Sequence, residues 1–161
     1  TPPEHYRARR FQDMAKPERT LRQRALEFLA RREYSRAELA RRLAPHAGSE
    51  DELQALLDEL STRKQLSDER YAEAKVNVLA RKFGTARILH ELKAKGIRGE
   101  LAERAVAEAQ SSELDRAREA WQRKFSSLPT TREEYARHAR FLQGRGFSFD
   151  TIRAVLKRDS E

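Results

Sequence analysis

The sequence predicts an all-α protein, built as three tandem three-helix units that form an elongated, curved helical array. Ala, Leu, Glu, Lys and Arg fill more than half of the 161 positions, a composition typical of strongly helical chains. Only four Val and three Ile are available to build strand cores. A pattern of apolar stripes and turn residues also repeats three times, with the equivalent aromatics Tyr34, Phe83 and Phe125 spaced 49 and 42 residues apart.

The first unit is expected to begin at Pro17, which suits the first turn of a helix that closes near Tyr34. Residues 35–38 read as a capping box, in which the Ser and Glu side chains satisfy free backbone N–H groups, and Pro45 stops that helix. A second capping box at 49–52 opens the third helix. The inward stripe is predicted to comprise Leu21, Ala25, Phe28, Leu29, Leu39, Leu43, Leu53, Leu56, Leu57 and Leu60.

The second unit repeats this plan. One helix is predicted from about Asp68 to Phe83, ending at Gly84, and Thr85 is expected to cap a shorter helix that Gly96 closes. A third helix follows. Its stripe and those of its two neighbours are predicted to comprise Ala72, Val76, Leu79, Phe83, Ile88, Leu92, Leu101, Ala105 and Ala109.

The third unit starts after Ser111 and Ser112, and residues 129–131 punctuate its first two helices. Its predicted stripes comprise Leu114, Ala117, Trp121, Phe125, Tyr135, Ala139, Leu142, Ile152, Val155 and Leu156. The resulting division is a flexible basic tail over 1–16, then units over 17–66, 67–110 and 111–161.

Two glycines flank Arg145, and a glycine cluster before a helix can cradle a phosphate. The dinucleotide and P-loop types need a preceding strand or a following Gly-Lys-Ser/Thr, and neither is present. Lys95-Gly96-Ile97 matches Arg145-Gly146-Phe147 in the next unit. Gly146 is therefore predicted to make a left-handed turn after a helix, with Phe147 folding back onto the core.

Charge and composition limit the function classes. The formal net charge of +8 favours a polyanion or an acidic protein surface as partner, although a solvated Arg-rich helical surface would have the same composition. The absence of Cys excludes disulfides and thiol nucleophiles and suits a reducing compartment. No apolar run approaches the roughly 20 residues that span a bilayer. We expect a cytoplasmic monomer with no membrane contact.

Catalytic and metal-binding patterns are missing. No pair of histidines has zinc spacing, and His90 is expected to face water, opposite the Ile88 and Leu92 stripe. There is no G-x-S-x-G nucleophile motif. The sequence predicts no enzyme, no cofactor and no metal site.

Three segments resemble the RecX family, the bacterial regulators of the RecA recombinase. The central segment over 65–97 (QLSDERYAEAKVNVLARKFGTARILHELKAKGI) is similar to the family signature. The segments over 24–43 and 139–156 resemble its first and last units, so the likeness runs in order over about 21–156. The first unit departs from the later two, because residues 44–48 replace the basic-Gly-apolar turn.

The resemblance implies a protein that lies in the groove of RecA filaments on single-stranded DNA and bridges neighbouring subunits. It implies restraint of filament growth, ATP hydrolysis, strand exchange and co-protease activity, with only weak, non-specific binding to nucleic acid alone. A helix-turn-helix-like protein that acts on DNA without RecA is the alternative, and a helical scaffold without nucleic acid is a third class.

The candidate contacts are basic residues that lie off the apolar stripes, near repeated helix ends. They are Arg31, Arg32, Arg41, Arg42, Arg81, Lys82, Arg87, Lys93, Lys95, Arg123, Lys124, Arg140 and Arg145. Each alone could be a solvated surface charge. The aromatics at helical spacing could stack on bases but are predicted to be core anchors; they are Tyr34, Phe83, Trp121, Phe125 and Phe147.

Overall fold

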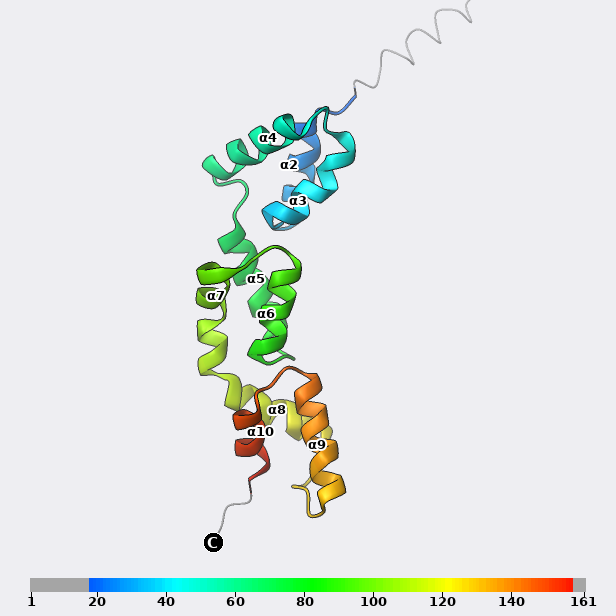
Figure 1. Ribbon diagram of the computed structural model, residues 1–161, viewed down its shortest axis with the longest axis vertical. Coiled ribbons are helices and arrows are strands. Elements are labelled where there is room, and N and C mark those ends of the chain that lie inside the picture. The colour runs from blue at the N-terminus through cyan, green and yellow to red at the C-terminus, as the bar shows by residue number, and fades with distance from the viewer. Residues whose placement is uncertain (1–17, 158–161) are drawn as a thin grey trace, which may run out of the picture.

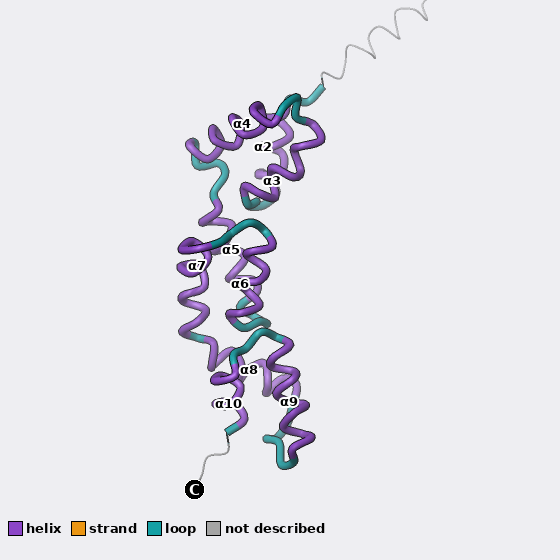
Figure 2. Tube along the Cα trace, in the orientation of Figure 1, coloured by secondary structure: helices purple, strands orange, loops and turns teal. Residues whose placement is uncertain are grey.

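The computed structural model describes residues 18–157, which form an elongated stack of three helical units along a shallow arc (Figure 1). The predicted tail over 1–16 lies outside the described residues. Helices connected by short loops account for residues 18–157, and no strand occurs among them (Figure 2). The all-α prediction and the three-unit array are confirmed.

The helices follow one another in three sets. The first unit contains α2 (Leu21–Arg31), α3 (Arg36–Leu43), a short 3₁₀ turn η1 (Ala44–His46) and α4 (Glu50–Thr62). The second contains α5 (Asp68–Leu79), α6 (Thr85–Ala94) and α7 (Gly99–Ser111). The third contains α8 (Glu113–Lys124), α9 (Arg132–Gly144) and α10 (Phe149–Leu156).

Each unit has its own apolar core. The first is rich in leucine, including Leu39, Leu43, Leu57 and Leu60, which are all fully buried. The second and third form separate clusters around α5–α7 and α8–α10. Because the three cores are not continuous, polar contacts at two joints carry much of the connection between units.

The two joints share one geometry. At the first, Ser35 Oγ donates to the Lys95 carbonyl at 2.7 Å, and at the second Gly84 N–H donates to the Arg145 carbonyl at 2.8 Å. In each case the turn between the second and third helices of one unit meets the turn between the first and second helices of the preceding unit. The repeat seen in the sequence is thus also a repeat of inter-unit contacts.

A second pair of hydrogen bonds reinforces the joints. Arg36 N–H donates to Asp68 Oδ1 at 2.8 Å, and Thr85 N–H donates to Glu113 Oε1 at 2.9 Å. The donors open the second helix of one unit, where backbone N–H groups lack helical partners. The acceptors begin the first helix of the next unit, so each joint caps a helix.

The glycine turns were predicted correctly. Gly96 and Gly146 have φ values of +82° and +85°, a region that residues with a β-carbon rarely adopt. Phe147 N–H donates back to the Leu142 carbonyl at 3.2 Å, and the Phe147 ring is buried. Gly146 therefore ends a helix, and the nucleotide-loop alternative is excluded.

Three helix limits were predicted wrongly, and one of them is the end of the first helix, which lies at Arg31 and not near Tyr34. The first helix begins at Leu21, because Thr20 and Gln23 form a reciprocal capping box; Pro17 lies outside the described residues. The α5 helix ends at Leu79, not Phe83. Arg116 explains the early end, since its guanidinium donates to the Ala80 and Phe83 carbonyls and replaces helical partners.

The predicted caps are partly right. Ser35 and Ser49 accept from the N–H groups of Glu38 and Glu52, both at 3.1 Å. Neither glutamate returns the bond expected in a capping box, since Glu38 pairs with Arg32 and Glu52 accepts from Gly48 N–H. Thr85 is not a cap. Gly84 holds that position, and Thr85 N–H is used at the joint.

Two stripes were also misassigned. The core face of α7 carries Ala102, Val106 and Ala109, whereas Leu101 and Ala105 are half-buried at its edge. On α9 the core position belongs to His138, 3% exposed, because it lies one turn before buried Leu142; Tyr135 is exposed.

Candidate functional site

All thirteen candidate cations belong to the first or second helix of a unit or to the turn that follows it. Eleven are exposed, and Lys95 and Arg145 are half-buried in the glycine turns. In Figure 1 the second helices α3, α6 and α9 lie on one side of the array and the third helices α4, α7 and α10 on the other. None of the candidate residues therefore belongs to a third helix.

The third helices differ in charge from the second. Between its bounds α4 carries Glu50, Asp51, Glu52, Asp58 and Glu59 and no Lys or Arg. By contrast, α3 carries two cations in its last turn, and α6 and α9 each carry more basic than acidic residues. The array thus has a basic second-helix side and a more acidic third-helix side, which favours a polyanion on the former.

The second joint brings together cations that are distant in sequence. Arg145 Nη1 donates to the Lys82 carbonyl at 3.4 Å across the joint. The guanidinium groups of Arg87 and Arg145 both lie over the Phe83 ring, 4.9 Å and 5.9 Å from its centroid. Cation–π contact at these distances holds both side chains at the surface. With neighbouring Arg81, these residues form what we call the second-joint patch: Arg81, Lys82, Arg87 and Arg145.

Some candidate cations are engaged within the protein. Arg32 pairs with Glu38 at 2.5 Å and lies 3.6 Å above the Tyr34 ring. This hydrogen bond, outweighing the opposing effect of burial, lowers the pKa of Glu38 and raises that of Arg32. Arg32 therefore fixes the end of α2, whatever else it contacts.

Other candidate cations do not join the patch. Arg123 pairs with Glu119 at 3.5 Å, and Lys124 Nζ lies 5.9 Å from the Phe141 ring centroid, both at the end of α8. On the first unit, Arg42 lies 5.9 Å from the Phe28 ring centroid. The set is therefore spread along the first and second helices, with one concentration at the second joint.

The aromatic residues pack inward, as predicted. Tyr34 and Phe147 are buried, and Phe83 and Trp121 pack against the second and third cores. Phe125 stacks on the His138 ring with centroids 3.7 Å apart. These contacts leave the aromatic faces occupied by protein, whereas His90 is exposed, as expected.

Sequence reasoning missed the buried acid of the second joint. Glu113 is 8% exposed and accepts hydrogen bonds from Thr85 N–H, Thr151 Oγ1 and Ser148 Oγ. Burial opposes its ionisation, but these bonds outweigh that effect and lower the pKa of Glu113. The matching Ser67-Asp68 and Ser112-Glu113 pairs were the available signal, since Asp68 does the same work at the first joint.

Two features of residues 18–157 concern metal binding and membrane crossing. Within that range there is no group of three or more His, Cys, Asp or Glu residues placed to hold a metal ion. No helix there combines the length and apolarity needed to cross a bilayer.

Comparisons with known proteins point to one family. The model of the third three-helix domain of RecX matches residues 111–156, and that of the second domain matches residues 67–106. Regulatory protein RecX of Leptothrix cholodnii is 48% identical over 142 residues, covering 88% of this chain and 90% of the relative. The same protein of Ralstonia nicotianae is 45% identical over 139 residues, covering 86% and 85%.

Solved structures agree on the fold. The crystal structure of RecX from Lactobacillus salivarius superposes with a TM-score of 0.74 at 22% identity, covering 84% of this chain and 92% of that one. A second crystal structure of a regulatory protein RecX gives a TM-score of 0.69 at 19% identity, covering 84% and 70%. Two family models and close relatives over most of its length show that this chain belongs to the RecX family of regulatory proteins.

Proposed function

We propose that this protein regulates the RecA recombinase by lying in the groove of RecA filaments on single-stranded DNA. It restrains filament extension, ATP hydrolysis, strand exchange and co-protease activity. Family membership supports the regulatory role, since its relatives are named regulatory protein RecX. The single structural observation that carries the proposal is the elongated array whose candidate cations all belong to first and second helices or the turns after them.

An array of this shape suits a repeating partner. Three units in a row present equivalent surfaces at successive positions, so one molecule contacts several filament subunits at once. Each contact is weak, because exposed cations contribute only about 0.2–1 kcal/mol per pair. Linked contacts add through effective concentration, so a monomer of three units 17–66, 67–110 and 111–161 binds the filament far more tightly than one unit does.

The thirteen cations are assigned to this interface, with the second-joint patch at its centre. Binding to nucleic acid alone is weak and independent of base sequence, since cations contact phosphates and do not read base edges. A DNA-binding protein that acted without RecA would instead hold a defined duplex site.

The test compares two charge-reversed variants in a RecA ATPase titration on single-stranded DNA. The first carries Arg81→Glu, Lys82→Glu, Arg87→Glu and Lys93→Glu on the second-helix side. The matched control has the same change in charge at exposed residues elsewhere: Arg63→Glu, Arg118→Glu, Arg153→Glu and Lys157→Glu. Four lost contacts of about 0.5 kcal/mol each predict a loss of inhibitory potency of roughly 30-fold for the first variant.

The control should stay within about threefold of the parent protein, since only its overall charge changes. Circular dichroism checks that both variants keep their helices. Binding is measured in parallel on RecA–DNA filaments, DNA alone and RecA alone. Equal potency of the two variants would remove the second-helix side from the proposal, and tight binding to DNA alone would favour the alternative.

A further inference from the structure

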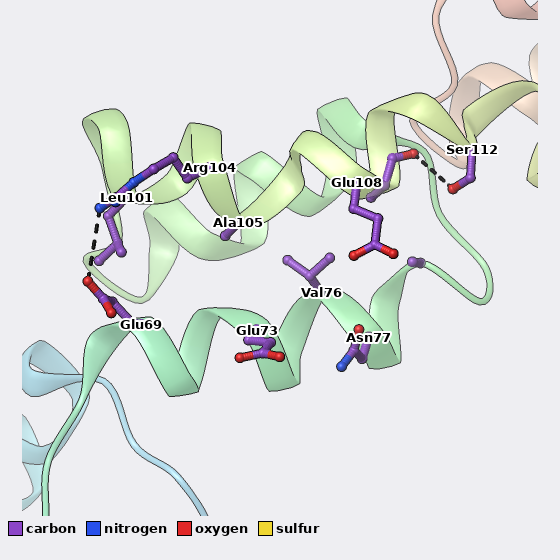
Figure 3. A pocket seen from close by; sticks show the side chains of 11 residues that line it. Glu69, Glu73, Val76, Asn77, Leu101, Arg104, Ala105, Glu108 and Ser112 are labelled. Atoms are coloured by element: carbon purple, nitrogen blue, oxygen red, sulfur yellow. Dashed lines mark hydrogen bonds and ion pairs between the residues drawn. The ribbon is translucent and has the colours of Figure 1, made fainter. Parts of the chain in front are cut away.

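A groove runs between α5 and α7 on the middle unit, and none of the thirteen candidate cations lines it (Figure 3). Its volume is about 480 Å³. Val76, Leu101 and Ala105 form an apolar floor, while Glu73 and Glu108 stand at its edges. Leu101 and Ala105 are the residues that the sequence wrongly placed in the core, and here they face a partly open surface.

The first unit contains a groove whose third-helix side uses the same repeat positions. Helices α4 and α7 are both 13 residues long, and residues 49 apart correspond: buried Leu53, Leu57 and Leu60 match Ala102, Val106 and Ala109. The groove beside α4 is lined by Glu52, Ala55, Leu56 and Glu59, which match Leu101, Arg104, Ala105 and Glu108. The two grooves therefore correspond on the side that the third helix forms. Their other sides differ, since the start of α2 lines the first groove and α5 lines the second along most of its length.

Side-chain size explains why the middle groove is larger. Leu56 of α4 is replaced by Ala105 in α7, and Leu60 by Ala109. The shorter alanine side chains leave the space between α5 and α7 unfilled, so the groove of the first unit measures about 330 Å³ against about 480 Å³ in the second.

The two grooves also differ in how their acids are neutralised. In the first unit the Arg22 guanidinium of α2 bridges the groove to Glu59, and this bond lowers the pKa of Glu59. In the second unit the equivalent acid is Glu108, and α5 faces it with Glu73 and Asn77 instead of an arginine. Arg104 is the one cation among the lining residues, and it lies 4.0 Å from Glu69 at the groove's end.

We propose that the basic segment over residues 6–11 docks in the middle groove and supplies an arginine opposite Glu73 and Glu108. Its sequence, Tyr-Arg-Ala-Arg-Arg-Phe, pairs three guanidinium groups with two aromatic rings. The rings suit the apolar floor, and a guanidinium bridges to Glu108 as Arg22 bridges to Glu59. The inference stands independently of the proposed function.

The chain is long enough for this contact. From Thr20, α2 extends about 16 Å at 1.5 Å per residue to the first joint, where Arg70 Nε donates to Glu33 at 2.8 Å. Glu69 is adjacent to Arg70 and marks the near end of the groove. Asn77 and Glu108 lie toward the other end of the groove (Figure 3), and Asn77 is about 12 Å beyond Glu69 along α5. Eleven residue steps lead from Glu18 back to Arg7, and an extended chain of that length covers about 36 Å, more than the roughly 28 Å of α2 and α5 together.

Docking has a consequence for charge. A docked segment places its arginines against Glu73 and Glu108, where they are withheld from any polyanion on the second-helix side. The contact is intramolecular, so effective concentration favours it without tight intrinsic affinity.

Disulfide trapping in the full chain tests the proposal, since the chain contains no Cys. One variant combines Ala8→Cys with Asn77→Cys, at the groove edge. Its control combines Ala8→Cys with Val78→Cys, which is one residue further along α5, exposed, and outside the groove lining. In a glutathione buffer the intramolecular disulfide of the first pair should form with at least tenfold higher effective concentration than that of the control.

Adding Glu73→Gln and Glu108→Gln to the variant with Ala8→Cys and Asn77→Cys should lower the effective concentration of its disulfide toward that of the control. These changes remove the two charges and leave the groove's shape intact. Equal effective concentrations for the two cysteine pairs would overturn the proposal. An effective concentration that the glutamine changes did not lower would overturn it as well. Disulfide-linked dimers at position 77 would show that the segment of a second copy occupies the groove. Since RecA is absent, the outcome is separate from that of the ATPase test.

Discussion

Gly84 lies against the backbone of Gly146 at the second joint. A β-carbon added to Gly84 would lie 2.6 Å from the Phe147 nitrogen and closer still to the Gly146 carbonyl. Backbone atoms cannot move aside as the end of a side chain can. The joint therefore depends on the absence of a side chain at this position.

Gly84→Ala should destabilise the third unit against the second by about 1–3 kcal/mol, the usual cost of overpacking. Urea unfolding followed by Trp121 fluorescence measures it. Gly144→Ala is the matched control, because a β-carbon there meets nothing within 4 Å and alanine is the better helix former. A midpoint as low for Gly144→Ala as for Gly84→Ala would contradict the assignment.

The buried ring of His138, which packs against Trp121 and Phe125, makes the stability of the third unit depend on pH. Its Nδ1 accepts from Trp121 Nε1 at 3.0 Å, and burial, aided by Arg137, lowers its pKa from the usual 6.5. Because the folded chain favours neutral histidine, the unfolded chain binds more protons below pH 6.5. Stability contributed by His138 is therefore complete above pH 6.5 and is lost as pH falls through its folded pKa.

Urea unfolding at pH 7.5 and pH 5.0 checks this sign. The parent protein should lose more stability than His138→Gln, whose amide oxygen keeps an acceptor for Trp121 but cannot titrate. If both proteins lost the same free energy of unfolding, His138 would not be the group responsible.

At the level of the helices, Ser35 and Ser49 are both N-caps, but only Ser35 also holds a joint. Ser49→Ala should cost about 1 kcal/mol, the usual value for a lost cap. Ser35→Ala should cost about 2–3 kcal/mol, since buried Ser35 loses a second bond and leaves the Lys95 carbonyl without its donor. Urea unfolding followed by circular dichroism compares the two variants. An equal loss of unfolding free energy in both would show that the bond from Ser35 to the Lys95 carbonyl does not stabilise the joint.

Much of each helix was predictable because its signals are local. Ser35, Ser49 and Gly146 act on backbone groups within a few residues, so the sequence alone identifies them. The start of α2 was missed although its Thr20–Gln23 capping box is local. The wrong end of α5 and the wrong cap at Thr85 arise where a distant residue intervenes. Arg116 ends α5 early from another unit, and Glu113 takes the N–H of Thr85.

The candidate site was likewise predictable only where its features are local. Helical periodicity predicted that the cations would be exposed, because outward positions follow from the apolar stripe. It could not predict that Arg145 meets Lys82 and Phe83, since that contact depends on how two units stack. Nor could it separate buried Ala109 from half-buried Ala105, because both line the groove and the packing of α5 against α7 decides how far each is covered.

For the whole molecule, three separate cores predict separable unfolding. Leu57 and Leu142 are both fully buried, in the first and third cores. Each substitution by alanine should cost about 2–5 kcal/mol in its own unit. Because Trp121 is the only tryptophan and lies in the third unit, its fluorescence reports on that unit alone.

Leu142→Ala should therefore lower the unfolding midpoint seen by Trp121 more than the midpoint seen by circular dichroism. Leu57→Ala should lower the circular dichroism midpoint and leave that of Trp121 nearly unchanged, as expected when units couple only to neighbours. A single transition that shifts equally by both probes in both variants would mean that the array unfolds as one body.

The polar joints have a mechanical consequence. When two units tilt against each other, the bonds at Ser35 or Gly84 can be exchanged for bonds to water, and no leucine core is opened. Rocking at a joint is consequently much less costly than melting a unit. The protein can therefore adjust its curvature to a helical partner whose pitch varies. All three units can then stay in contact with that partner, whereas a rigid array would contact it at one point.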